Sequence, residues 1–271
     1  LLNLILCTFW GITNGASIII ANAKGANDPE KARRSIGNTT LLMIIASVLV
    51  MIFGAIFSKP LLVALKTNEE FLDKASTYIM IYFLGAPLNL LFNAGAAILR
   101  AFGDSKRPFI AVTISGVVNV ILDFIFVYFL RMDVAGVALA TIISQGVAMV
   151  IVYVYLIKDK RLFANFERKY IRLYKAETRE ILFLGITNGL QGFIFNFTNV
   201  FIQKCVNELG PAAVIGKAAG SNIEGYEYAL LNSISVTCLI SVSQNYGAKK
   251  YGNLKKTLFL KILQEYLNYH I

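Results

Sequence analysis

The sequence predicts an all-α protein that crosses a membrane several times, and its composition and the spacing of its apolar residues lead to this fold class. Hydrophobic residues make up 56% of the 271 residues, charged residues make up 15%, and the mean hydropathy is +0.62. A soluble domain carries about 25% charged residues. The apolar residues also come in runs of about twenty, the helix length that crosses roughly 30 Å of hydrocarbon. We therefore expect a polytopic transmembrane helical bundle surrounded by lipid.

Seven blocks have this length, and none of them contains lysine, arginine or glutamate. Glycine and proline inside the blocks are compatible with membrane helices. Pro87 lies in the middle of its block and removes a backbone donor, so it should bend its helix. We expect one spanning helix in each block. The approximate blocks are 1–23, 39–57, 75–99, 109–130, 134–157, 181–203 and 228–246.

The positive residues between the blocks predict the orientation. When the connections are numbered alternately, 19 lysines and arginines fall on one side and six on the other. Cytoplasmic loops retain positive charge, so the basic loops should be cytoplasmic in a multi-pass plasma-membrane protein whose residue 1 lies outside. The net charge of +10 then reflects topology. A nucleic-acid surface would not respect this alternation, so we expect the lipid bilayer and no nucleic acid as a partner.

An internal repeat predicts how the helices are grouped. Residues 21–26 (ANAKGA) resemble residues 243–248 (SQNYGA) at an offset of 222 residues, and a basic loop follows both segments. A rival register aligns the pentamer GITNG at 11–15 with an identical copy at 185–189. Those two blocks should run in opposite directions, so we interpret the pentamer as a coincidence.

The offset of 222 residues implies six helices in each repeat, and the first block already begins at Leu1. We therefore expect seven of twelve helices, in two six-helix lobes related by an axis along the membrane normal. The chain would then be a fragment that lacks the first helix and the last four, and the complete protein should be monomeric. The predicted divisions are 1–157 for the first lobe, 158–180 for a cytoplasmic linker, and 181–271 for the start of the second lobe.

The linker mixes eight basic residues with four aromatic ones. This composition predicts a helix that lies in the headgroup layer, with a solvated linker as the alternative. The aromatic residues are Phe163, Phe166, Tyr170 and Tyr174.

Asp123 is the single Asp, Glu, Lys, Arg or His in the seven blocks. A carboxylate within hydrocarbon costs roughly 2.5–3.5 kcal/mol on insertion scales, so a functional role is the first hypothesis. Asn119 lies one turn earlier on the same helical face. Amide and carboxylate oxygens suit a small hard cation such as Na⁺, and a low dielectric would equally make the acid a proton carrier. The alternative is a structural aspartate paired with a helix upstream.

Other polar residues are candidates for a substrate cavity or for coupling. Thr141 and Gln145 are one turn apart in the fifth block, and the sixth block is unusually polar, with Asn188, Gln191 and Asn196 among its residues. Such side chains equally serve as hydrogen bonds between membrane helices.

Cysteine and histidine indicate no catalytic or metal centre. The three cysteines and His270 show no metal-ligand spacing, and one intramembrane carboxylate without a base or a nucleophile supports little chemistry. We therefore expect no enzyme, no cofactor and no metal beyond a coupling ion at Asp123.

Three motifs together resemble the MATE (multidrug and toxic compound extrusion) transporters. They are the run 99–108 (LRAFGDSKRP), Asn119-x-x-x-Asp123, and the run 136–141 (GVALAT). The Gly-Ala turns at 25–26 and 247–248 are similar too, and the resemblance covers about residues 3 to 256. It implies twelve helices in two lobes and export of drugs or other organic compounds, cationic ones among them, in exchange for Na⁺ or H⁺.

The resemblance also implies site residues. In one branch of the family, a cation site in the first lobe uses an Asn and an Asp on one helix and a Thr on the next, which here are Asn119, Asp123 and Thr141. An acid that this branch carries on its first helix would lie before Leu1. Another branch carries a glutamate where residues 181–203 here have no acid. The segment from Arg100 to Pro108 is expected to be a turn and a charge anchor.

Two other functions remain open from the sequence. One is a flippase of lipid-linked saccharides in the same superfamily, which would need cationic residues toward its cavity. The other is a truncated product with no activity of its own.

Overall fold

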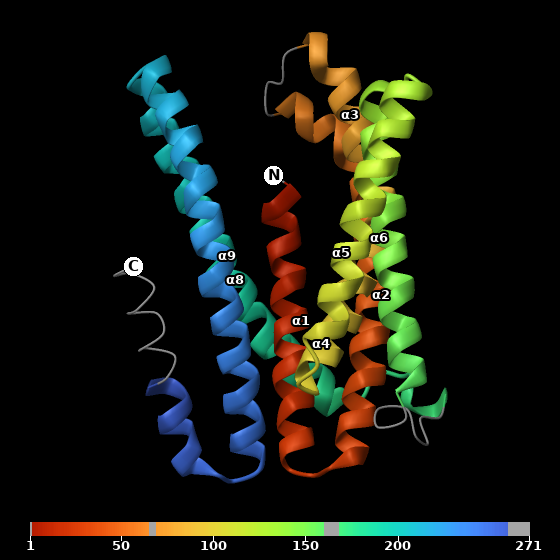
Figure 1. Ribbon diagram of the computed structural model, residues 1–271, viewed down its shortest axis with the longest axis vertical. Helices are drawn as coiled ribbons and strands as arrows, with labels where there is room; N and C mark the ends of the chain where they lie inside the picture. Colours follow the sequence, from red (N-terminus) through yellow and green to blue (C-terminus); the bar gives the residue numbers. More distant parts are fainter. Residues whose placement is uncertain (1, 65–68, 160–167, 260–271) are drawn as a thin grey trace. The chain divides into compact units, whose positions relative to one another are not determined.

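The computed structural model describes residues 2–64, 69–159 and 168–259, and every regular element in these ranges is helical (Figure 1). The predicted all-α class is confirmed. The elements are α1 (Leu2–Gly25), α2 (Pro29–Ala64), α3 (Glu69–Leu84), α4 (Ala86–Ala101), α5 (Lys106–Asp123), the π-helix η1 (Phe124–Phe129), α6 (Asp133–Lys158), the 3₁₀ turn η2 (Arg168–Tyr170), α8 (Lys175–Glu208) and α9 (Pro211–Gly247).

Each of the seven apolar blocks is helical where the structure describes it. Among the described residues, α2, α5 with η1, α6 and α8 are long and apolar enough to cross a membrane, and α3 with α4 makes a fifth if the pair is one broken span. The break between α3 and α4 bends the chain by 44°. It falls at Gly85, two residues before Pro87, and confirms the predicted bend.

Several helices run well beyond the apolar blocks that predicted them. α2 has 36 residues, α8 has 34 and α9 has 37. Hydropathy detects the part of a helix that lies in hydrocarbon, whereas backbone hydrogen bonds continue into the polar interface where good helix formers allow it. Arg34 pairs with Glu30 one turn away on α2, a spacing that stabilises such an extension.

The helices form two compact units. In one unit, α1 packs against α8 and α9, and the first turns of α2 belong with them. In the other unit, α6 is the central helix and packs against α3, α4 and α5. These units reflect which helices touch within this chain, so the lobe boundaries at 157 and 181 remain a prediction.

Two identical pentamers meet where α1 crosses α8. A methyl group added to Gly11 would collide with the backbone of Gly185 and Gly189, and one added to Gly15 would collide with Ile181 and Gly185. The backbones approach this closely because none of these glycines has a side chain, as in small-xxx-small contacts between membrane helices. The recurrence of GITNG was interpreted as coincidence. The contact gives both copies a packing role without relating them as repeats, so that interpretation stays a prediction.

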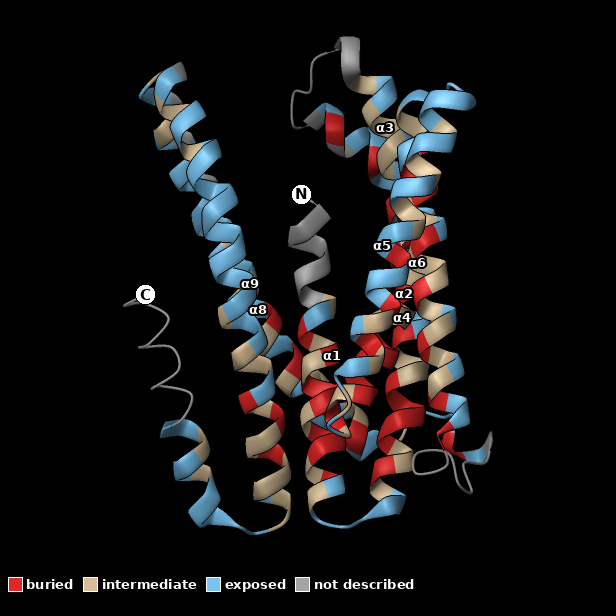
Figure 2. Cartoon of the chain, in the orientation of Figure 1, coloured by how far each residue is buried: buried red, intermediate tan, exposed pale blue. Residues whose placement is uncertain are grey.

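The contact between α1 and α9 supports the repeat with an offset of 222 residues. Gly25 lies against the backbone of Gln244, and Gly247 lies against the backbone of Asn22. The offset relates Gly25 to Gly247 and Asn22 to Gln244, so the two contacts are equivalent under the repeat. A reciprocal contact of this kind is what a local two-fold axis produces. Figure 2 shows that α9 is exposed along the half distant from this contact.

The turn between α4 and α5 carries the predicted charge anchor. Gly103 adopts a φ of 83°, a conformation that ends α4 and that glycine accepts without strain. Asp104 accepts a hydrogen bond from the backbone N–H of Arg107 at 3.1 Å and pairs with its guanidinium. Arg107 also pairs with Asp159, whose side chain is only 5% exposed, and lies over the ring of Tyr155. The turn therefore joins the ends of α5 and α6.

We expect Arg107→Ala to lower the free energy of unfolding by about 1–3 kcal/mol, because it removes a charged hydrogen-bond donor from an almost fully buried carboxylate. The measurement is thermal unfolding of the complete protein in detergent. Lys59→Gln is the matched control, since its pair with Asp73 is exposed and should contribute almost nothing. Equal melting temperatures for the two variants would contradict the role of Arg107.

Between the end of α6 and the start of α8, the structure describes residues 159 and 168–174 of the linker, and these do not form the predicted helix. Phe163 and Phe166 lie outside the described residues. The described part is η2 and an irregular stretch that docks on α2. Tyr170 is buried against Gly37, and the carbonyl of Tyr174 accepts a hydrogen bond from Asn38 Nδ2 at 3.3 Å. The two tyrosines therefore attach this stretch to the protein, and they do not form the apolar face of an interfacial helix.

Candidate cation site

Asp123 is the last residue of α5 and the point at which the helix changes its winding. The six residues of η1 follow it directly as a π-helix. Most π segments are single turns within α-helices and are found frequently at functional sites. The residues around it, Val120 and Phe124, are apolar and mostly exposed, as expected for a helix in lipid. The carboxylate therefore lies within a hydrophobic span at an irregularity of the backbone.

Asn119 and Asp123 each have a polar atom without a partner. Asn119 Nδ2 and Asp123 Oδ1 are buried and make no hydrogen bond in the part of the chain that the structure describes. Buried polar atoms in folded proteins are almost always satisfied, so an exception calls for an explanation. Turning the amide over would present its oxygen beside the carboxylate. The two side chains then offer oxygen ligands for a cation, on one face and one turn apart.

The packing of α5 on α6 places Thr141 level with Asn119. Ser115 donates a hydrogen bond from Oγ to the carbonyl of Ser144 at 2.6 Å, which sets these residues opposite one another. The helices are antiparallel, so the next turn of α5 brings Asn119 level with Thr141. The Thr141 hydroxyl donates to the carbonyl of Val137 at 2.9 Å. Its oxygen keeps lone pairs that could accept a cation.

An open pocket of about 820 Å³ lies beside Asp123 and is lined by it, by residues of η1 and by Arg131. No ion pair joins Asp123 to Arg131 among the described residues. Asp123 therefore borders this pocket together with an arginine to which it is not ion-paired in the described part of the chain.

Further polar side chains lie around the break between α3 and α4, and most of them were not predicted from the sequence. Gln145 interacts with the hydroxyl of Tyr82, three residues before the break. On α4, Asn93 donates from Nδ2 to Asn89 Oδ1 at 3.1 Å. The two asparagines have the same one-turn spacing as Asn119 and Asp123, and that spacing in an apolar block was the signal that could have found them.

The polar residues of α8 mostly bond to their own helix. Asn188 donates to the carbonyl of Leu184 and Asn196 donates to that of Gly192, both at 2.8 Å, while Gln191 is exposed. Asn188 also lies between the two glycines of the crossing with α1. A substrate-binding role for these three residues stays a prediction.

Comparison with known proteins places the chain among transporters. The MatE family model matches residues 1–125 and 188–267. A probable multidrug resistance protein of Bacillus subtilis, YoeA, is 27% identical over 95% of this chain and 57% of its own length. An FAD transporter of Shewanella oneidensis is also 27% identical, over 93% of this chain and 56% of its own length. The chain thus spans little more than half of the curated relatives it matches.

Solved structures share the fold. A MOP superfamily transporter from Pyrococcus furiosus superimposes with a TM-score of 0.86 at 22% identity, covering 96% of this chain and 58% of that one. The outward-facing conformation of a multidrug resistance MATE family transporter gives a TM-score of 0.85, again at 22% identity, over 96% and 58% of the two chains. The helical architecture is therefore that of this group of membrane transporters.

Proposed function

The chain belongs to the MatE family of membrane transporters, and we propose that the complete protein is an antiporter that exports organic compounds in exchange for Na⁺ or H⁺. Asp123 binds the coupling cation or proton, with Asn119 and Thr141 as further ligands. Two lobes alternate access to a site between them, as in other transporters with repeated halves. The Bacillus subtilis relative is named as a probable multidrug resistance protein and the Shewanella oneidensis relative as an FAD transporter, and both names support a small organic substrate.

The observation that carries this proposal is a carboxylate oxygen of Asp123, inside an apolar span, that has no partner among the described residues. A structural aspartate would be expected to satisfy both oxygens with fixed partners. A coupling aspartate needs free ligand capacity that a cation or a proton fills and leaves. The unpartnered amide one turn away adds a second ligand position of the same kind.

The experiment that tests this function uses the complete protein in sealed vesicles loaded with a fluorescent organic cation such as ethidium. An inward Na⁺ or proton gradient is expected to accelerate efflux and to sustain it when ethidium is added outside at a higher concentration, because the coupling cation drives the return step. An ionophore that collapses the effective gradient should abolish the acceleration. Efflux that is indifferent to both gradients, with the protein shown to be folded, would refute cation coupling.

A further inference from the structure

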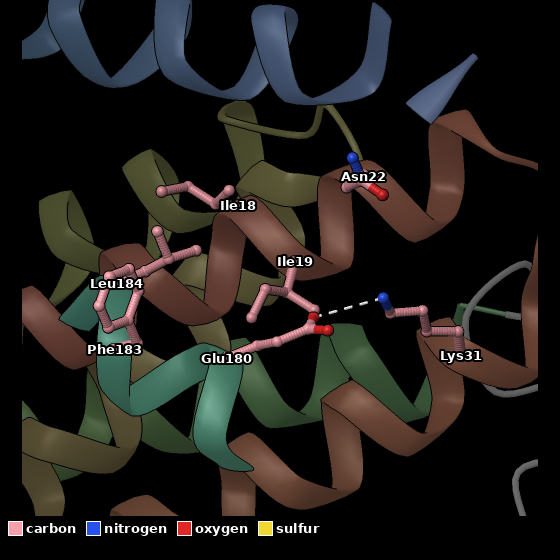
Figure 3. Close-up of a pocket in the computed structure, with 7 residues that line it drawn as sticks. All are labelled: Ile18, Ile19, Asn22, Lys31, Glu180, Phe183 and Leu184. Carbon is pink, nitrogen blue, oxygen red and sulfur yellow. Dashed lines mark hydrogen bonds and ion pairs between the residues drawn. The ribbon is translucent and has the colours of Figure 1, made fainter. Parts of the chain in front are cut away.

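A separate pocket, of about 300 Å³, lies between α1, α8 and the start of α2 (Figure 3). Ile18, Ile19, Phe183 and Leu184 form its apolar lining. Its polar groups are Asn22 and an ion pair between Lys31 Nζ and Glu180 Oε2 at 3.3 Å. In Figure 3, Phe183 and Leu184 lie at one end, Lys31 at the other, and the Glu180 carboxylate between them.

We propose that this pocket binds hydrophobic organic cations and that the Lys31 ammonium is their built-in competitor for Glu180. This inference rests on the proposed export of organic compounds and adds a first binding site on the side where the basic loops lie. Ligand pockets combine apolar walls with a few polar groups, and the volume here is at the small end of that range. A carboxylate beside aromatic and aliphatic walls matches a ligand that carries one positive charge on an apolar body.

The ion pair is suited to exchange. The Lys31 and Glu180 side chains are 36% and 52% exposed, and a pair this accessible to water contributes little to stability. Lysine has a flexible side chain and a compact charge, so the Lys31 ammonium can move into water without leaving the Glu180 carboxylate as a buried, unpaired charge. A ligand cation can then take its place on Glu180 while the apolar body of the ligand covers Phe183 and Leu184.

The pocket is also next to the closest helix contacts of its unit. Asn22 lines the pocket, and its backbone lies against Gly247 of α9. Leu184 lines it too, and the following residue, Gly185, is part of the crossing with α1. A ligand that enters here therefore lies where α1 meets both α8 and α9. Any rearrangement of those contacts during transport would change the shape of the pocket.

The test is a cysteine-protection measurement on the complete protein, in detergent, with its native cysteines replaced. Leu184→Cys places a reactive thiol in the pocket wall, and the probe is tetraphenylphosphonium, which should slow labelling of this thiol by a maleimide. Lys31→Gln removes the competitor and is expected to lower the half-protecting concentration about fivefold. Glu180→Gln removes the binding charge and should raise it by about the same factor or more.

Three controls sharpen the result. Neutral triphenylphosphine oxide should protect equally in all variants. Lys217→Gln and Glu224→Gln break a comparable exposed ion pair on α9 and should leave protection by the cation unchanged. Asp123→Asn should leave protection unchanged while it removes gradient-driven efflux, which separates failure of this site from failure of the coupling proposal.

The test depends on the directions in which the two pocket variants shift the half-protecting concentration. If Lys31→Gln and Glu180→Gln shift the half-protecting concentration in the same direction, the ion pair is structural and the proposal is overturned. The same conclusion follows if neither variant changes protection. Tighter binding after loss of Lys31 together with weaker binding after loss of Glu180 supports a cation site.

Discussion

Asp123→Asn is expected to abolish ion-gradient-driven efflux by the complete protein while it raises the melting temperature. The amide has the shape of the carboxylate, but it carries no charge to hold a cation and does not take up a proton in the physiological range. A carboxylate in hydrocarbon costs roughly 2.5–3.5 kcal/mol on insertion scales, and the substitution removes that cost. Loss of activity combined with gain of stability is the pattern expected when a residue is kept for function at the expense of stability.

The measurement compares ethidium efflux from vesicles and thermal unfolding in detergent for the same preparations. Asp133→Asn is the matched control, because Asp133 is an exposed aspartate that pairs with Lys74 at 2.7 Å at the start of α6. It should retain full efflux and gain no stability. Undiminished efflux by Asp123→Asn would show that the coupling site lies elsewhere, and a lower melting temperature would show that Asp123 is a structural residue.

The sequence was informative about this site because the chemistry there is unusual for its surroundings. One acid among seven apolar blocks identifies Asp123 without knowledge of the fold, and the spacing of four residues adds Asn119. The sequence did not reveal the π-helix that begins after Asp123, because no residue in FIFVYF distinguishes a π turn from an α turn. Nor did it reveal Tyr82 beside Gln145, since that contact depends on the angle between two helices.

The sequence predicted those features of the fold that depend on a local stretch of residues. Apolar length predicts where a helix meets hydrocarbon, and Pro87 predicts a bend, because both act locally. The outer ends of α2, α8 and α9 are polar, so hydropathy did not detect them. The docking of Tyr170 on Gly37 depends on residues more than a hundred positions apart. Contacts of that kind are determined by the packing of distant segments, and no local sequence pattern predicts them.

The crossing of α1 and α8 is expected to tolerate no side chain on its glycines. Gly11→Ala or Gly185→Ala should lower the free energy of unfolding by about 1–3 kcal/mol, because the added methyl group meets the backbone of the opposite helix and not a movable side chain. Leucine at either position should separate the helices and prevent stable folding. Gly116→Ala is the matched control, since it lies in a helix with nothing within 4 Å of the added carbon. It should be neutral or slightly stabilising, because alanine favours helix over glycine.

Thermal unfolding followed by a thiol-reactive dye provides the measurement, in a protein whose other cysteines, the exposed Cys205 among them, are replaced, since Cys238 is buried in α9 and becomes accessible when the helices part. The double variant Gly11→Ala with Gly185→Ala tests whether the two glycines act through the same helix contact. Once one methyl group has moved the helices apart, the second meets less resistance, so the combined loss should be smaller than the sum of the two single losses. Full additivity would mean that the glycines act independently. The identical pentamers would then owe their recurrence to something other than the contact between α1 and α8.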